Sequence, residues 1–441
     1  MIYIVSPGDS VFSVASAFSV SPDRLRYDNQ LDATDTLVIG QALLVLIPQT
    51  IHQVIPGDTA LSIAESYDIT LRELLQRNPF LAQNISPNAS SGEDTPALFS
   101  SQIPLTPGQF LVIRYTEDPS DTTSLEGYAY PFIRKNILRE ALPYLSTLYV
   151  FSYGFNTDGS LIEPPNADFL LQEAALFGVE PILVLTPLTE SGTFNSNLIV
   201  ALLEDELLQE RVINELIRVS LEKGFGGIDV DFEFIPEENR DDYTTFVARL
   251  AEQAHQNNLT VSVALPPKTS ADQRGLLYEG IDYGGLGAIA DQVLLMTYEW
   301  GYTYGPPMAI SPLPNVRRVV EYALTEIPAD KIFLGIPNYA YDWPLPFVRG
   351  TTAATTIGNA QAVDIARTNG SVIQYDEQSL APFFIYNAEG TQREVWFEDI
   401  RSIQAKFDLI KEYGLAGGGY WNLMRPFRAN WVMAGAEFEL E

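Results

Sequence analysis

Acidic and apolar side chains alternate along residues 224–234, which read GFGGIDVDFEF. The acids are Asp229, Asp231 and Glu233. Because successive side chains of a β-strand point to opposite faces, these three carboxylates share one face. Like charges roughly 6 to 7 Å apart in a buried site repel each other, so we expect at least one acid to keep or share its proton. The apolar residues expected on the opposite face are Ile228, Val230, Phe232 and Phe234.

A helical pattern precedes this strand. From Leu202 to Lys223 apolar residues recur largely at three- and four-residue steps, and Gly224 then supplies a stop signal. Helix, short turn and buried strand form the repeating unit of a parallel α/β fold. The alternative is an exposed edge strand whose acidic face is solvated, and the continuously bulky opposite face argues against it.

The chain after residue 127 alternates between strand patterns and helical patterns. Eight strand–helix units predict an α/β fold of the closed (β/α)8 TIM barrel type rather than an open doubly wound sheet. No Gly-rich phosphate loop follows the first strand, which also argues against a nucleotide-binding sheet. The expected strands are Tyr128–Ile133, Thr147–Tyr153, Pro181–Thr186, Gly227–Phe234, Thr260–Leu265, Gln292–Tyr298, Lys331–Ile336 and Gly417–Trp421.

The active site of such a barrel lies at the carboxyl ends of its strands. Glu233 ends the fourth expected strand, and Tyr298 ends the sixth. An insertion over about 344–396, with strand-like runs of its own, is expected to form one wall of the cleft. The residues that we expect to bind substrate at these strand ends are Trp421, Trp300, Glu299, Tyr420, Asn338 and Tyr339.

The run GIDVDFE over residues 227–233 resembles the fourth-strand signature of glycoside hydrolase family 18, written DGxDxDxE. One position departs from that signature, because Gly226 stands where the family has its first Asp. The resemblance implies hydrolysis of N-acetylglucosamine linkages with retention of configuration, in which the substrate supplies the nucleophile.

The same resemblance implies a role for each site residue. Glu233 would protonate the leaving oxygen while the acetamido carbonyl of the bound N-acetylglucosamine attacks the anomeric carbon. Asp231 would hydrogen-bond the acetamido N–H, and Asp229 would share a proton with Asp231. Tyr298 would orient the acetamido oxygen, and Trp421 would pack under the sugar ring.

Residues 1–115 contain a repeat. Val5–Ser10, reading VSPGDS, aligns with Val54–Thr59, reading VIPGDT, and Asn29 aligns with Asn78. Each copy predicts a short strand, a turn at Pro-Gly-Asp, two helices and a closing strand. The second copy carries an insertion over 83–102 that is rich in Ser, Asn and Pro.

These copies resemble LysM domains, which are βααβ modules that bind N-acetylglucosamine polymers such as peptidoglycan and chitin. The resemblance places the sugar groove between the loop after the first strand and the loop before the last. Asp9 and Asp58 also fit a purely structural role as turn and helix-cap residues. The two roles are compatible, because a cap residue can line a groove as well. The implied groove residues are Gly8, Asp9, Ser10, Val11 and Ile39 in the first copy, and Gly57, Asp58, Thr59, Ala60, Thr106 and Pro107 in the second.

The polar, acidic run over 117–127, EDPSDTTSLEG, reads as a linker between the modules and the barrel. The expected domains are therefore a first LysM module over 1–48, a second over 49–116 and the barrel over 128–441. Two weak sites on one chain gain avidity through effective concentration, so the modules would hold an insoluble polymer near the catalytic face.

Charge and composition exclude several classes of function. A net charge of −31, from 57 acidic and 26 basic residues, argues against nucleic acid or an anionic membrane as the partner. The chain has no cysteine and only two histidines, which excludes disulfides, thiol catalysis and a histidine-rich zinc site. We expect no metal and no cofactor. The N-terminus lacks the basic and apolar regions of an export signal, and no run is apolar enough to span a membrane.

The order of LysM modules and barrel, with the runs MTYEWGYTYGPP and VWFEDIRSIQAK, resembles the spore-cortex-lytic N-acetylglucosaminidases of endospore-forming bacteria. The resemblance implies hydrolysis of bonds that follow N-acetylglucosamine in cortical peptidoglycan fragments, and we expect a spore-associated monomer. Asp229 departs from it, because that subgroup has Asn there and general chitinases have Asp. Chitin oligomers therefore stay open as the substrate. A catalytically silent wall- or coat-binding protein is a second alternative, and retention of Glu233, Asp231 and Tyr298 argues against it.

Overall fold

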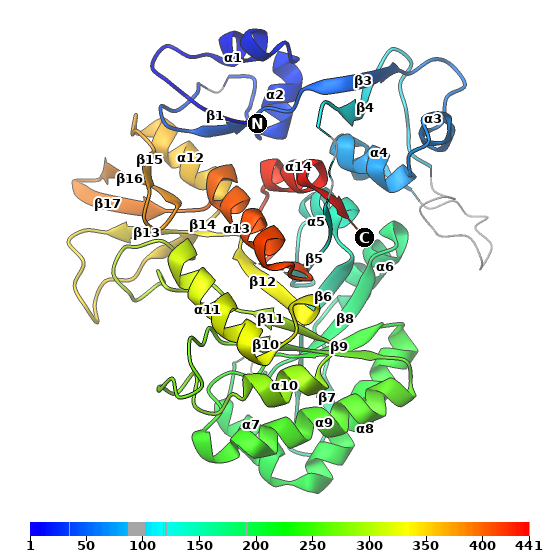
Figure 1. Ribbon diagram of the computed structural model, residues 1–441, viewed down its shortest axis with the longest axis vertical. Coiled ribbons are helices and arrows are strands. Elements are labelled where there is room, and N and C mark those ends of the chain that lie inside the picture. The colour runs from blue at the N-terminus through cyan, green and yellow to red at the C-terminus, as the bar shows by residue number, and fades with distance from the viewer. Residues whose placement is uncertain (35, 87–101, 118, 120, 190–192, 441) are drawn as a thin grey trace.

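Eight parallel strands form a closed barrel at the centre of the computed structural model, which describes residues 1–34, 36–86, 102–117, 119, 121–189 and 193–440 (Figure 1). Every neighbouring pair in the barrel is parallel, and the pairing of the first strand with both the last and the second closes the circle. The predicted TIM barrel is confirmed. Its strands are β5 (Asp121–Ala129), β6 (Thr147–Phe155), β8 (Glu180–Leu185), β9 (Gly227–Val230), β10 (Thr260–Leu265), β11 (Gln292–Leu295), β12 (Ile332–Pro337) and β18 (Gly417–Trp421).

Helices pack around the outside of the barrel and bury one apolar face each. Helix α8 (Glu206–Lys223), for example, buries Leu208, Val212 and Leu216, and it ends at Gly224 in the left-handed conformation. The other helices of this layer are α5 (Lys135–Ala141), α6 (Ala167–Phe177), α7 (Ser196–Glu204), α9 (Arg240–Gln256), α10 (Tyr283–Ile289), α11 (Leu313–Glu326), α13 (Ile400–Tyr413) and α14 (Arg428–Glu437).

The single helix expected over 202–223 is wrong. Helix α7 ends at Glu204, and the Asp205 side chain accepts hydrogen bonds from the backbone N–H groups of Leu207 and Leu208 to begin α8. An aspartate in the middle of an apolar periodicity therefore serves as a helix cap, which the periodicity alone did not reveal.

The acidic strand is shorter than expected. Strand β9 ends at Val230, although the Asp231 N–H still donates to the Leu185 carbonyl at 3.0 Å. Phe232 packs outward against the helices, whereas Phe234 is 51% exposed and has a φ of 60°. The expectation that Phe234 shares the buried apolar face is wrong, because the chain turns away from the sheet beyond Phe232.

The expected linker over 117–127 is wrong from Asp121 onward, because strand β5 covers Asp121–Ala129. The segment looks polar because its buried positions include Thr123 and Glu126, which point into the protein rather than into solvent. Strand β5 pairs with β18 and β6, and short strand β19 (Phe438–Leu440) extends it at its start. The first barrel strand therefore begins where the composition indicated a flexible connection.

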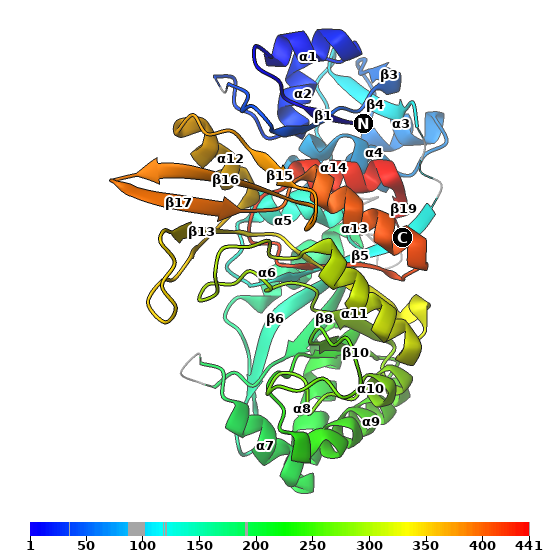
Figure 2. The same ribbon diagram turned by 60° about the vertical axis from the view of Figure 1, so that its left-hand side comes forward.

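An antiparallel sheet with one helix is inserted between β12 and α13 and projects from the side of the barrel (Figure 2). We call this unit the insertion. The sheet begins at Ala340, before the expected start of the insertion, and its strand order is β14-β13-β17-β16-β15. Its elements are β13 (Ala340–Pro344), β14 (Thr355–Ile357), α12 (Asn359–Thr368), β15 (Gln374–Asp376), β16 (Ala381–Ala388) and β17 (Thr391–Trp396).

The two N-terminal modules have the predicted βααβ order, and in each the two strands pair antiparallel. Asn29 and Asn78 occupy equivalent places, since each side chain bonds both the second helix and the closing strand. The elements are β1 (Ile2–Ile4), α1 (Val11–Phe18), α2 (Pro22–Asp28) and β2 (Ala42–Leu44), then β3 (Pro48–Gln53), α3 (Ala60–Ser66), α4 (Leu71–Arg77) and β4 (Phe110–Tyr115).

Both modules pack directly on the barrel rather than hanging from a tether. Helix α14 lies against α2 and α4, as Figure 1 shows. The buried apolar residues of the second module belong to the same continuous core as the barrel. Over the described residues, no helix is both long and apolar enough to cross a membrane. The two modules therefore pack against the barrel through α14 and, for the second module, through a shared apolar core.

Candidate active site

Three carboxylates line up at the carboxyl end of β9. Asp229 lies inside the strand and is fully buried, and Asp231 and Glu233 follow directly beyond it, partly buried. The pleat of the strand places Asp229 on the face opposite Ile228 and Val230, whose side chains lie in the outer apolar core. The sequence therefore builds an acidic series that leads from the barrel interior to its mouth.

Asp229 is held on both oxygens. The Ser262 hydroxyl donates to Oδ1 at 2.7 Å, and the Tyr128 hydroxyl donates to Oδ2 at 3.1 Å. Burial raises the pKa of Asp229 to about 6, although both hydrogen bonds favour the ionised form. This carboxyl group therefore takes up a proton close to neutral pH.

Asp231 has no such support. Among the described residues, its buried Oδ1 has no hydrogen-bond partner. Burial, followed by the charges of Glu233 and Asp229, raises the pKa of Asp231 well above the ordinary value of an aspartate. A buried polar atom without a partner is costly, so this oxygen is suited to accept a hydrogen bond from a bound ligand.

Glu233 and Glu299 lie close enough for the charge of one to affect the other. Burial, and then the neighbouring Glu299 carboxylate, raises the pKa of Glu233. The Tyr339 and Tyr341 hydroxyls both donate to the Glu299 carboxylate, Tyr341 at 3.0 Å. Tyr298 lies beside these acids, and burial together with the charges of Asp231 and Glu233 raises its pKa well above the ordinary value. Its hydroxyl therefore stays protonated and can donate a hydrogen bond.

Trp421 ends β18 within a cluster of aromatic rings. Its ring centroid lies 4.8 Å from that of Phe151, 5.8 Å from Tyr128 and 6.3 Å from Tyr130. The surrounding rings fix the indole and leave part of it open to solvent. A fixed, partly open indole is a suitable surface for packing against a sugar ring.

Residues 191–425 match the model of the family described as glycosyl hydrolases family 18, and residues 3–45 and 52–89 match the LysM domain. The chain is 38% identical over 440 residues to the cortical fragment-lytic enzyme of Bacillus subtilis, covering 100% of this chain and 98% of that protein. This chain belongs to glycosyl hydrolases family 18. It is therefore a glycosidase.

Solved structures agree with this over the full length. The spore cortex-lytic enzyme SleL of Bacillus megaterium superimposes with a TM-score of 0.80 at 34% identity, and that of Bacillus cereus with a TM-score of 0.81 at 34% identity. Each comparison covers 100% of this chain and 98% of the other. The arrangement of modules, barrel and insertion is thus common to this chain and to these enzymes.

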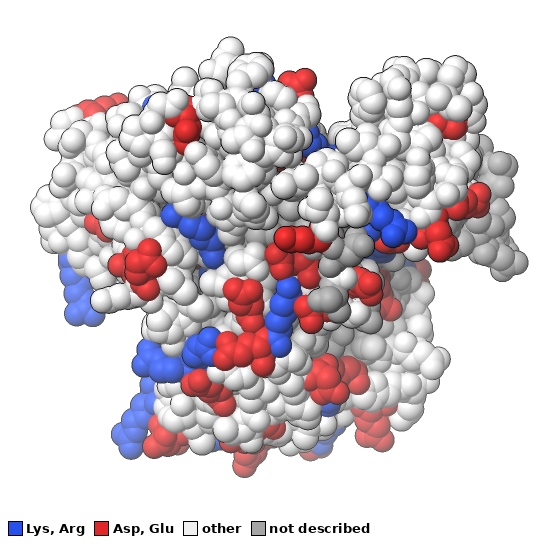
Figure 3. Space-filling view, turned by 45° about the horizontal axis from the view of Figure 1, so that its top comes forward, with Lys and Arg blue, Asp and Glu red and all other residues white. Residues whose placement is uncertain are grey.

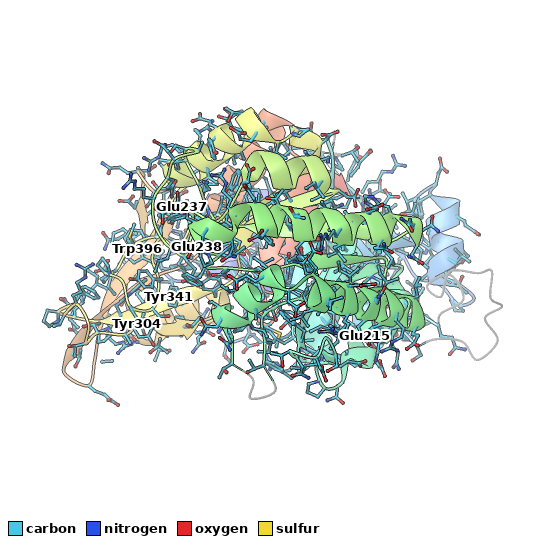
Figure 4. The ribbon with its side chains drawn as sticks, turned by 90° about the horizontal axis from the view of Figure 1, so that it is seen from below. Glu215, Glu237, Glu238, Tyr304, Tyr341 and Trp396 are labelled. Atoms are coloured by element: carbon cyan, nitrogen blue, oxygen red, sulfur yellow. The ribbon has the colours of Figure 1, made fainter. Side chains whose placement is uncertain are left out.

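Figure 4 shows where three aromatic side chains lie relative to the barrel. Tyr304, Tyr341 and Trp396 gather at the side of the molecule that carries the insertion. Glu215 lies on the opposite side on α8, where it pairs with Arg218 at 2.7 Å. Tyr341 also bonds Glu299, so the insertion contributes directly to the surroundings of the acids.

Two of the residues expected to bind substrate, Tyr420 and Asn338, support the fold instead. Tyr420 is fully buried, and its hydroxyl donates to Asn430 Oδ1 at 2.8 Å. Asn338 is buried and donates to the carbonyls of Asn422 and Arg425 at the carboxyl end of β18. Trp300 packs partly buried against the main core. A residue at a strand end can point to the outer layer of helices or to the barrel mouth. Its place in the sequence alone did not show which of the two it faces.

The sequence pattern did not reveal a buried glutamate in the barrel interior. Glu126 on β5 is 1% exposed and accepts a hydrogen bond from the Tyr149 hydroxyl at 3.0 Å. Burial raises its pKa well above the ordinary value. Glu126 and Tyr128 lie two residues apart on β5, so their side chains share one face of the strand. This shared face was not recognised, because residues 117–127 were assigned to a linker. Tyr128 and Ser262, the partners of Asp229, were missed as well.

The predicted LysM residues lie around the turns that open each module. Asp9 Oδ2 accepts from Ser6 N–H and the Tyr3 hydroxyl, each at 2.7 Å, and Asp58 makes the equivalent bonds. The helix caps are Ser10 and Thr59 rather than the aspartates. Val11 and Ala60 begin the helices and are buried, whereas Gly8, Gly57, Ile39, Thr106 and Pro107 are exposed. Among the described residues, no cluster of His, Cys, Asp and Glu suits a metal ion.

Proposed function

We propose that this enzyme hydrolyses the bond that follows N-acetylglucosamine in spore cortical peptidoglycan, acting on fragments released by other lytic enzymes. The observation that carries the proposal is the buried acidic series at the mouth of the barrel, in which Asp231 has an unpartnered oxygen beside Glu233. The full-length similarity to cortical fragment-lytic enzymes supports the choice of substrate. We expect the enzyme to act as a spore-associated monomer.

In the proposed reaction Glu233 begins protonated and donates its proton to the leaving glycosidic oxygen. The acetamido carbonyl oxygen of the N-acetylglucosamine unit attacks the anomeric carbon as that bond breaks, which gives an oxazolinium ion. Water then attacks the anomeric carbon from the opposite face and returns a proton to the Glu233 carboxylate. The raised pKa of Glu233 keeps the proton available at the start of the cycle.

Asp231 accepts a hydrogen bond from the acetamido N–H and stabilises the positive charge that develops on the oxazolinium ion. Its buried Oδ1 needs such a donor. Asp229 shares a proton with Asp231 so that both acids are never fully charged together, and it stays in place through Ser262 and Tyr128.

Tyr298 donates its hydroxyl to the acetamido oxygen and orients that oxygen for attack. The raised pKa of Tyr298 supports this role, because the hydroxyl keeps its proton in a buried place near four carboxylates. Trp421 packs under the acetamido methyl group and the face of the ring. Binding of another part of the same polymer by the LysM region keeps the polymer near the barrel.

The test is to incubate the enzyme separately with purified cortical fragments and with N-acetylglucosamine oligomers, and to measure new reducing ends. We expect release from the cortical fragments. Release from the oligomers alone would favour a chitinase, which Asp229 in place of Asn makes the second candidate. No new reducing ends from either substrate would contradict the proposal and favour a protein that only binds the wall.

A further inference from the structure

The two LysM modules have the same backbone arrangement just before their closing strands. Gly40 donates its N–H to the first strand of its module at 2.9 Å, and Gly108 does the same in the second module at 2.7 Å. The glutamine after each glycine accepts a hydrogen bond from the loop on its side-chain oxygen, in both copies at 3.2 Å. Residues 38–40 and 106–108 are therefore equivalent, and we call them the late loops.

The late loop of the first module is docked onto the insertion. Val38 is 4% exposed and belongs to the apolar core of the insertion. The Ile373 N–H donates to the Ile39 carbonyl at 2.9 Å, and a Cβ added to Gly40 would collide with the Ile373 carbonyl. This loop thus adds a backbone contact and a buried side chain to a neighbouring unit.

Two arginines, one in the insertion and one on barrel helix α13, bond backbone carbonyls in and just before the same loop. Arg367 on α12 donates to the Thr36 carbonyl at 2.9 Å, and Arg401 on α13 donates to the Gly40 carbonyl at 3.4 Å. The backbone carbonyls on this side of the first module are therefore engaged by protein donors.

The late loop of the second module has no such neighbour among the described residues. Thr106, Pro107 and Gly108 are all exposed. Within the described part of the chain, no atom lies within 4 Å of a Cβ added to Gly108. Figure 3 shows that much of the surface of the modules is uncharged, as suits a neutral sugar polymer.

We propose that the two modules divide their roles, so that the second module binds the N-acetylglucosamine polymer and the first docks the insertion. This inference rests on the proposed function of the modules as glycan-binding units. A glycan that enters between residues 57–60 and the late loop of the second module meets the exposed residues Thr106, Pro107 and Gly108. At the first module the glycan would meet the Ile373 backbone, because the Ile39 carbonyl already accepts a hydrogen bond from the Ile373 N–H.

The docked loop also has a structural consequence for the barrel mouth. Val38 shares its core with Ala340 on β13, and the residues on either side of Ala340 are Tyr339 and Tyr341, which hold Glu299. The first module therefore supports the strand that carries the wall of the active site.

Amide hydrogen exchange of the full chain, measured with and without N-acetylglucosamine hexamer, tests this division. The Glu233→Gln variant is used so that the hexamer is not cleaved. We expect the hexamer to slow exchange at least threefold in peptides covering 57–60 and 106–109, and to leave peptides covering 8–11 and 38–41 unchanged. Equal or greater protection of the first module would overturn the proposal.

A matched pair of substitutions, one in each late loop, tests the same division of roles by a second comparison. Ile39→Arg and Pro107→Arg change equivalent, exposed positions. We expect Pro107→Arg to abolish the protection of the second module and Ile39→Arg to leave it intact, and the reverse pattern would contradict the assignment. Protection of neither module in the parent would reject both this inference and glycan binding by the modules. The reducing-end assay would still report separately on the barrel.

Discussion

The Ser262 hydroxyl donates a 2.7 Å hydrogen bond to Asp229, the innermost acid of the site. Tyr128 holds the other oxygen of the same carboxylate, whereas Asp231, two residues further on, has an unpartnered buried oxygen among the described residues. The two acids, one in β9 and one just beyond its end, thus differ in their hydrogen bonds. Asp229 is fixed by two protein hydroxyls, whereas Asp231 keeps an oxygen that the proposed function assigns to the substrate.

The pH dependence of stability follows from the pKa of Asp229, which is about 6 in the folded protein against an ordinary value of 3.8. Between about pH 4 and pH 6 the unfolded chain releases this proton while the folded protein keeps it, so the free energy of unfolding falls as pH rises. The fall is on the order of 3 kcal/mol at about 1.4 kcal/mol per pKa unit.

The Asp229→Asn variant tests this dependence, because an amide does not titrate. Urea denaturation at pH 4 and at pH 7 should show that the variant gains stability relative to the parent as pH rises. A difference between variant and parent that is the same at both pH values would show that Asp229 titrates as it does in the unfolded chain.

Tyr298→Phe removes one hydroxyl from the site while keeping the ring that packs in the aromatic core. If the hydroxyl orients the acetamido oxygen, kcat should fall by about 10² to 10³, the usual effect of losing one donor to a developing charge. The matched control is Tyr243→Phe, because the buried Tyr243 hydroxyl has no hydrogen-bond partner in the described structure. Similar kcat values for the two variants would argue against the assigned role of Tyr298.

Glu299→Gln should shift the pH dependence of kcat/KM and not only lower its value. The Glu299 carboxylate raises the pKa of Glu233, and Glu233 must be protonated to act as an acid. Removal of the negative charge lowers the pKa of Glu233, so the alkaline limb of kcat/KM should move to lower pH. A limb that stays in place or moves to higher pH would mean that another group controls it.

Arg428→Ala should destabilise the contact between the first module and the barrel. Arg428 pairs with the buried Glu140 at 2.7 Å, and its guanidinium lies 4.0 Å from the centre of the Tyr27 ring. Loss of one partner leaves a buried charge uncompensated, which costs about 3 kcal/mol. Arg218→Ala, which breaks surface ion pairs with Glu215 and Glu222, should cost only about 0 to 1 kcal/mol in the same denaturation experiment.

Strict periodicity made the barrel and the acidic series predictable. The strand Thr260–Leu265 and the strand Gly417–Trp421 have the expected bounds, since each is a continuous buried run between clear turns. Asp229, Asp231 and Glu233 could be predicted because three acids in step with a strand are rare on a surface and rarer in a core.

Other features depend on contacts between distant segments. Glu126 looked like part of a polar linker, because its burial is produced by β6 and β18 on either side of β5. Tyr420 looked like a substrate contact, and only the position of Asn430 shows that it supports α14. The docking of residues 38–40 on the insertion pairs segments more than three hundred residues apart, and no local pattern encodes it.

The most direct test of the account is the activity of Glu233→Gln on cortical fragments, measured as new reducing ends, beside its binding to the same fragments. A glutamine keeps the shape of the side chain and cannot donate the catalytic proton. We predict a loss of at least about 10² to 10⁴ in rate, with binding retained. Cleavage at close to the parent rate would contradict the assignment of Glu233 as the acid, and with it the central claim.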